Sequence, residues 1–161
     1  MIFDGTKVQD ELFFETETRK HQQEVGRFMM RFAQAILERA AKHDASKLEE
    51  PERAIFIEYT PKLKGSTYGS DAYMAFLREM EVALDHHYSH NPHHPEYHLG
   101  EYPVQGMTLL DMVEMLCDWL AATKRHADGD IYKSININEK RFKMDGQVAQ
   151  LLRNSVGMLE G

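Results

Sequence analysis

The stretch that most constrains this chain is residues 85–103, DHHYSHNPHHPEYHLGEYP, which holds six of the nine histidines and three prolines. Imidazole is the commonest protein ligand for transition metals, and neighbouring imidazoles without a metal would repel one another once protonated. The run lies in mid-chain between two amphipathic segments, which disfavours a tag-like or solvated tract. We therefore predict a metal site to which His86 or His87 and His93 or His94 contribute.

Length and composition narrow the class of protein. A chain of 161 residues can bury one substantial core, so we expect a single domain over residues 1–161. The formal net charge of -7 argues against strong nucleic-acid binding. The single cysteine, Cys117, excludes a Cys-rich zinc site, so any metal is held by nitrogen and oxygen. With neither a leader nor a bilayer-spanning apolar run, a cytoplasmic protein without membrane binding is expected.

Apolar residues recur at helical spacing and strand-like alternation is short, which predicts an all-α fold, a compact helical bundle. Residues 1–15 have no clear period and predict an irregular lead-in, and the turn formers of residues 60–70 predict an exposed loop. Ser70 and Thr108 are predicted helix caps. Helices are predicted over residues 16–42, 51–59, 70–87, 109–122, 131–142 and 147–159.

Other candidate ligands lie at a helix end or on an apolar face. His21 continues the apolar stripe of the first predicted helix, a position where a lone histidine is more often a core residue. His43 and Asp44 end that helix, and a neighbouring imidazole and carboxylate can each donate one bond to a divalent ion. Lys47, three residues later, can face a phosphate from the same turn. These residues predict a metal site beside a phosphate-binding lysine.

The most apolar predicted helix carries three acids on one face, Asp111, Glu114 and Asp118. Acids on such a helix are costly to bury unless a metal or a charged partner receives them. This favours Asp118 as a metal ligand, whereas the helix dipole alone explains Asp111 in the first turn. Farther along the chain, Arg125 and Lys133 are basic residues available to a substrate.

The order of His21, His43-Asp44, the histidine pairs and Asp118 resembles the HD-domain superfamily of metal-dependent phosphohydrolases, whose compact helical fold binds a divalent metal through such side chains. The sequence HDASK is similar to the superfamily's His-Asp-x-small-Lys signature. Over nearly its full length the chain also looks like a family of small phage and bacterial proteins without an established activity. The segments that match are HDASKLEEPE, YTPKLKGSTYGS, ALDHHYSHNPHHPEY, MTLLDMVEMLCDWLAATKRH and KSININEKRF. If the chain is phage-encoded, the expected compartment is the host cytoplasm.

One branch of the superfamily hydrolyses cyclic dinucleotides, and the chain shares part of its pattern. Glu17 precedes His21 by four residues, and His93-His94 is followed by Tyr102-Pro103. The intervening PEYHLGE departs from that pattern, and the glycine before Tyr-Pro is missing. The resemblance therefore implies a multinuclear centre and not this particular substrate.

Together these features imply a phosphohydrolase that acts on a nucleotide or another small phosphate ester through a metal-activated water. The expected cofactor is two divalent ions of Mn, Fe, Co, Ni or Zn. Glu114 would accept a proton from the water or orient a ligand. Lys47 would offset phosphoryl charge, and Arg125 with Lys133 would hold other phosphates. The first ion is assigned to His21, His43, Asp44 and Asp118, and the second to His86 or His87 together with His93 or His94.

Two other functions fit the same residues. Some HD-like folds hold two irons between four histidines and two aspartates and activate oxygen, and the ligand count permits this. A non-catalytic binding protein could keep a metal for structure or for ligand capture, with a closed coordination sphere. The identity and redox behaviour of the metal would separate the three functions.

Overall fold

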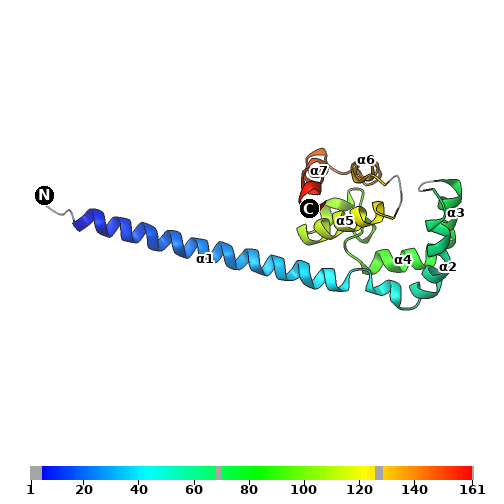
Figure 1. Cartoon of the computed structure of the whole chain (residues 1–161), viewed down its shortest axis with the longest axis horizontal. Helices are drawn as coiled ribbons and strands as arrows, with labels where there is room; N and C mark the ends of the chain where they lie inside the picture. Colours follow the sequence, from blue (N-terminus) through cyan, green and yellow to red (C-terminus); the bar gives the residue numbers. More distant parts are fainter. Residues whose placement is uncertain (1–4, 68–69, 126–128, 161) are drawn as a thin grey trace. The chain divides into compact units, whose positions relative to one another are not determined.

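The computed structural model describes residues 5–67, 70–125 and 129–160. Every regular element in these ranges is helical, which confirms the predicted all-α class. None of these helices combines the length and apolarity that a membrane span requires. The elements, shown in Figure 1, are α1 (Gly5–Lys42), η1 (Ala45–Leu48), α2 (Glu52–Lys64), α3 (Asp71–Glu79), α4 (Glu81–His90), η2 (Pro95–Tyr97), η3 (Pro103–Gly106), α5 (Leu109–Thr123), α6 (Ile131–Arg141) and α7 (Gly146–Glu160), the η elements being short 3-10 helices.

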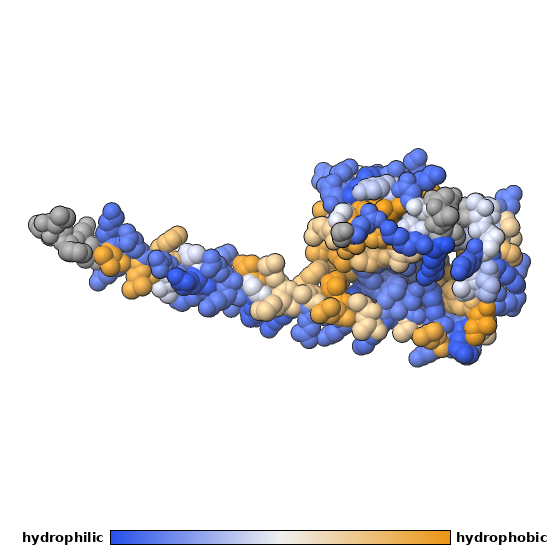
Figure 2. Space-filling model, in the orientation of Figure 1, coloured by the Kyte–Doolittle hydropathy of each residue, from blue (hydrophilic) through white to orange (hydrophobic). Residues whose placement is uncertain are grey.

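The chain divides into two compact units, Met1–Ala41 and Lys42–Gly161. The single domain expected from sequence stays a prediction. Apart from its last residue, α1 belongs to the first unit, and it begins at Gly5, so the irregular lead-in predicted over residues 1–15 is wrong from residue 5 onward. No proline interrupts this stretch, which allows the helix to form without an apolar period. Apolar and hydrophilic side chains both cover α1 in Figure 2, and Leu12 and Phe28 are more than half exposed.

The second unit has its apolar core among α5, α6 and α7. Met115 of α5 packs with Ile135 of α6 and with Leu152 and Val156 of α7, and all four are almost fully buried. Burying a side chain of this size contributes about 1.5–3 kcal/mol to folding. This core fixes α5, which carries Glu114 and Asp118.

Both predicted helix caps are confirmed. Ser70 Oγ accepts a hydrogen bond from the Tyr73 amide at 3.2 Å. Thr108 Oγ1 accepts a hydrogen bond from the Asp111 amide, and the Asp111 carboxylate accepts a hydrogen bond of 2.7 Å from the Thr108 amide. Asp111 therefore belongs to a capping box, and this role accounts for an acidic residue at this buried position without a metal.

Two boundaries differ from the prediction. The loop expected from residue 60 begins later, because α2 continues through Pro61 to Lys64. A proline near the C-terminal end of a helix removes only one hydrogen bond, and here the helix tolerates that loss. The helix predicted over residues 70–87 is two helices, α3 and α4, which Met80 separates with φ -88° and ψ 3°. Residues 68 and 69 of the predicted loop lie outside the described residues.

Candidate metal centre

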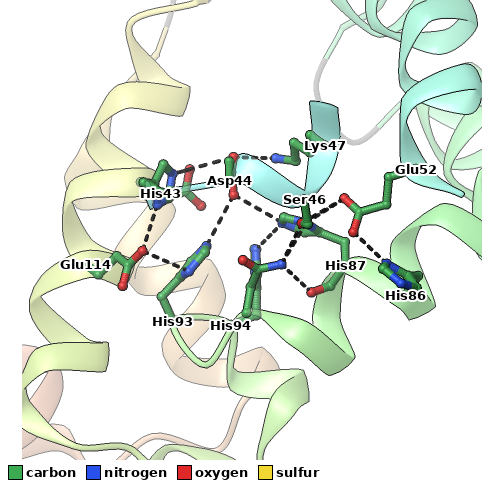
Figure 3. A network of polar contacts seen from close by, with 12 residues as sticks. His43, Asp44, Ser46, Lys47, Glu52, His86, His87, His93, His94 and Glu114 are labelled. Carbon is green, nitrogen blue, oxygen red and sulfur yellow. Dashed lines mark hydrogen bonds and ion pairs between the residues drawn. The ribbon is translucent and has the colours of Figure 1, made fainter. Parts of the chain in front are cut away.

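Asp44 stands at the centre of the candidate site because of an unusual backbone conformation. Asp44 is the second residue after the end of α1, and its φ and ψ are 56° and 16°, in the left-handed region. Aspartate tolerates this region better than most residues other than glycine. The chain then enters η1, whose first turn is closed by a hydrogen bond of 3.0 Å from the Lys47 amide to the Asp44 carbonyl. In Figure 3, His43, Asp44 and Lys47 lie along the upper side of the cluster, with Asp44 in the middle.

The two oxygens of Asp44 face two different sets of imidazoles. Oδ1 lies 3.2 Å from His87 Nε2 and 3.6 Å from His93 Nε2. Oδ2 lies 3.5 Å from His43 Nε2, which is itself 3.7 Å from Asp118 Oδ1. The described residues thus include groups whose donor atoms are spaced to hold a metal ion. They are Asp44, His87, His93 and His94; His43, Asp44 and Asp118; and His43, His93 and Glu114.

Glu114 orients two of these histidines. Its Oε1 lies 2.9 Å from His43 Nδ1 and 3.2 Å from His93 Nδ1. A carboxylate only accepts, so each ring donates from Nδ1 and turns Nε2 toward Asp44. In this structure Glu114 has the geometry of an orienting group, which is one of the two roles that the sequence suggested.

Glu52, the first residue of α2, does the same for the α4 histidines. It is fully buried, and its Oε2 lies 2.9 Å from His87 Nδ1 while its Oε1 lies 2.8 Å from His86 Nδ1. The Ser46 hydroxyl donates to Oε2 at 3.1 Å. His87 consequently presents Nε2 to the cluster, whereas His86 belongs to none of the ligand groups found among the described residues. The structure thus separates the first histidine pair, with His87 turned inward.

His94 joins the cluster through the backbone before Pro95. A residue that precedes proline favours an extended conformation, and His94 has φ -88° and ψ 128°. Its Nε2 lies 3.0 Å from His87 Nε2, and its ring lies 4.2 Å from that of His93 between centroids. Both members of this second pair therefore reach the same group of ligands.

Two buried polar atoms in the cluster make no hydrogen bond, namely Asp44 Oδ1 and His93 Nε2. An unsatisfied buried polar group costs about 1–3 kcal/mol. A carboxylate oxygen and imidazole nitrogens that converge in this way are the donor set of a borderline divalent cation. The residues therefore fit a metal, and a bound ion would satisfy both atoms.

The pKa values follow from burial and from these contacts. The Asp118 carboxylate, against the effect of burial and with help from Glu114 and Asp44, raises the pKa of His43 to about 9. Burial and the neighbouring imidazoles lower the pKa of His94 to about 3, and burial also lowers that of His93. Burial would raise the pKa of Asp44, but contact with His87 and Lys47 holds it well below its usual range. At neutral pH the metal-free cluster therefore has anionic Asp44, cationic His43 and neutral His93 and His94.

The remaining candidate residues lie in different places. Lys47 Nζ is 2.6 Å from Asp44 Oδ2 and therefore at the cluster. Arg125 and Lys133 are exposed, and among the described residues no hydrogen bond or ion pair of their side chains reaches the cluster. His21 is an exposed residue of α1, in the other unit, and its role as a ligand stays a prediction. Cys117 is exposed and stands in no ligand group of the described chain.

Sequence reasoning missed Glu52, Ser46 and Asn91. Asn91 Nδ2 donates to the His87 carbonyl at 2.7 Å and to Ser46 Oγ at 3.0 Å, which ties the end of α4 to η1. In the sequence Glu52 reads as an ordinary first-turn acid after a proline. Only the packing of α2 on α4 brings it to histidines 34 and 35 positions later.

Comparison with known proteins gives a family and no activity. No curated protein and no solved structure matches the chain. One family model matches residues 10–158, which include every residue of the candidate metal site described above. The chain therefore belongs to the family described as "Family of unknown function (DUF5662)".

Proposed function

We propose that this protein is a metal-dependent phosphohydrolase acting on a nucleotide or another small phosphate ester. The observation that carries the proposal is the position of Asp44. One of its oxygens is buried beside His87 and His93 without a hydrogen bond, and the other is paired with Lys47. A metal site with an adjoining fixed cation suits a substrate with several anionic oxygens.

His87, His93 and His94 with Asp44 would hold one ion, and His43 with Asp44 and Asp118 the other. Nitrogen and oxygen donors rich in imidazole suit Mn, Fe, Co, Ni or Zn. Ions held there would supply positive charge to phosphoryl oxygens and would activate a water molecule.

The protein's own side chains orient the ligands and bind phosphate. Glu114 and Glu52 hold the rings of His43, His93 and His87 so that each turns Nε2 into the cluster, where it would be available to a metal. Lys47 offsets the charge on the phosphoryl group, and Arg125 and Lys133 hold the other phosphates of a nucleotide. Since Glu114 already accepts from two imidazoles, orientation is the role we assign to it.

A second function is favoured by one specific observation. The side chains in the first two ligand groups are four histidines and two aspartates, the set with which some HD-like folds hold two irons and activate oxygen. The experiment that separates the functions is elemental analysis of the purified protein, followed by a screen of nucleotides and phosphodiesters with each added metal. Phosphate release with a redox-inert ion supports hydrolysis. A coloured iron centre that consumes oxygen and releases no phosphate would refute the hydrolase proposal. A metal-loaded protein that neither releases phosphate nor consumes oxygen would point to a binding protein.

Lys47 gives a prediction that distinguishes phosphate binding from metal binding. We expect Lys47→Ala to keep its metal and to lose turnover by about ten- to a thousandfold, because one charge-assisted contact with a phosphoryl oxygen is worth about 1.5–3 kcal/mol or more at a desolvated site. Metal content by elemental analysis and kcat on the substrate found in the screen are the measurements. The matched control is Lys62→Ala, which removes an exposed lysine paired with Glu58 on α2. Equal kcat in Lys47→Ala and the wild type would remove Lys47 from the site.

A further inference from the structure

His86, which the metal cluster leaves out, forms a pair with His90 on the same face of α4. The two residues are four positions apart, which places their side chains one above the other on a helix. Their rings are stacked, with centroids 4.0 Å apart and planes inclined by 17°. His86 is about one-third exposed and His90 is exposed, so both are open to an ion from solution.

The hydrogen bonds of both rings fix which nitrogen carries the proton. His86 Nδ1 faces Glu52 Oε1 at 2.8 Å, and His90 Nδ1 faces the carbonyl oxygen of His86 at 2.7 Å. A carboxylate and a carbonyl only accept, so each Nδ1 donates and each neutral ring keeps its lone pair on Nε2. Among the described residues, no hydrogen bond or ion pair uses Nε2 of either ring.

Two imidazoles four residues apart on a helix, each with Nε2 free, can bind one transition-metal ion once the rings rotate out of their parallel stack, because each Nε2 lone pair lies in the plane of its ring. In metal sites the other ring nitrogen of a ligating histidine commonly donates to a carboxylate or a carbonyl, as it does in both rings here. We propose that His86 and His90 form an outer binding site for a single divalent transition ion such as Ni²⁺, Cu²⁺ or Zn²⁺. Two protein donors leave its remaining coordination positions to water.

The outer site shares one buried carboxylate with the inner cluster. Glu52 holds His86 through Oε1 and His87 through Oε2, and its side chain is fully buried. Glu52 does not contact His90, so a substitution at His90 should leave the orientation of the inner ligands unchanged. The proposal stands independently of any hydrolase activity.

The test is a calorimetric titration with Ni²⁺ alone. The sample is the whole protein after all metal has been removed. We expect His90→Gln to lower the total by one ion per chain, or to weaken one class of site by about tenfold or more, since one of two donors acting on one ion is lost. The tightly held metal, measured separately by elemental analysis after dialysis, should not change. Val82→Gln is the matched control, because it places the same side chain four residues before His86 on an exposed position of α4.

Two further variants complete the test. His86→Gln should remove the same ion as His90→Gln, and Glu52→Gln should weaken the outer and the inner sites together, because both rings lose their fixed orientation. Circular dichroism melting checks that each variant folds. Unchanged Ni²⁺ stoichiometry and affinity in folded His90→Gln would overturn the proposal. That outcome would leave the hydrolase proposal intact, since His90 is no part of it.

Discussion

Replacing Asp44 with asparagine is expected to lower the affinity for the inner metal by about a hundredfold or more and to abolish turnover. Removing one partner from a buried, compensated ionic group costs about 3–5 kcal/mol, and 1.36 kcal/mol corresponds to a factor of ten. Asparagine also tolerates the left-handed backbone at this position, so the fold should persist. Elemental analysis and the rate of phosphate release are the measurements.

A comparison with Asp44→Ala separates the ligand from the backbone. Both variants lose the carboxylate, but alanine with φ near 56° costs about 1–2 kcal/mol more than asparagine. In metal-free protein the alanine variant should therefore melt at a lower temperature than the asparagine variant, whereas both lack metal. Full metal occupancy in Asp44→Asn would exclude Asp44 as a ligand.

Removing the metal from the wild-type protein should lower its melting temperature by on the order of 10 °C at pH 8. An ion present at a thousand times its Kd stabilises the folded state by about 4 kcal/mol, and for a chain of this size each kcal/mol shifts the midpoint by about 2–4 °C. The measurement is a thermal melt with and without a strong chelator, after elemental analysis shows that the metal has gone. Identical melts would mean that the histidines do not tie the helices together.

The same effect should depend on pH through His43. In metal-free protein its pKa is raised from the ordinary 6.5 to about 9, so its protonated form stabilises the fold below pH 6.5, and this contribution is lost as the pH rises toward 9. Metal binding displaces that proton, so between these values the apparent affinity should rise about tenfold per pH unit. The gap between the melts with and without metal therefore widens from pH 6.5 to 9, and His43→Gln should remove this slope.

The pKa values also determine how the metal should be released by acid. Histidines with an ordinary pKa near 6.5 would release their metal together as the pH falls below about 6. In the folded cluster the pKa of His43 is higher, while those of His93 and His94 are lower, so protons compete over a wider range. We therefore expect gradual release as the pH falls and not one narrow step.

The helices that sequence reasoning placed well are those with a strong period and a cap. Thr108 and the apolar residues of α5 define that helix from both its start and its face. The start of α1 was missed because residues 5–15 form a helix without a consistent apolar face. The sequence does not predict the break at Met80, because the apolar period continues through it.

The candidate site was predictable as a set of residue types and less so as an arrangement. Adjacent residues on a helix point about 100° apart, so only one of His86 and His87 can face inward, and the sequence does not say which. In the structure it is His87 that faces inward, through its contacts with Glu52 and Asp44. His93 and His94 escape this limit because they lie after the end of α4, in a turn before Pro95, where both rings can reach one cluster.

The buried Glu52 also has a consequence for how this part of the protein opens. Its charge is compensated by imidazoles of α4 and by the Ser46 hydroxyl of η1, and a buried charge left without partners costs several kcal/mol. Partial separation of α2 from α4 is therefore disfavoured relative to complete opening, which lets water reach the carboxylate. Amide hydrogen exchange should report α2, η1 and α4 as one cooperative unit with a common opening free energy. Independent exchange of α2 would contradict this coupling. A common opening free energy would mean that the part of the candidate metal site on these three elements is lost in a single step.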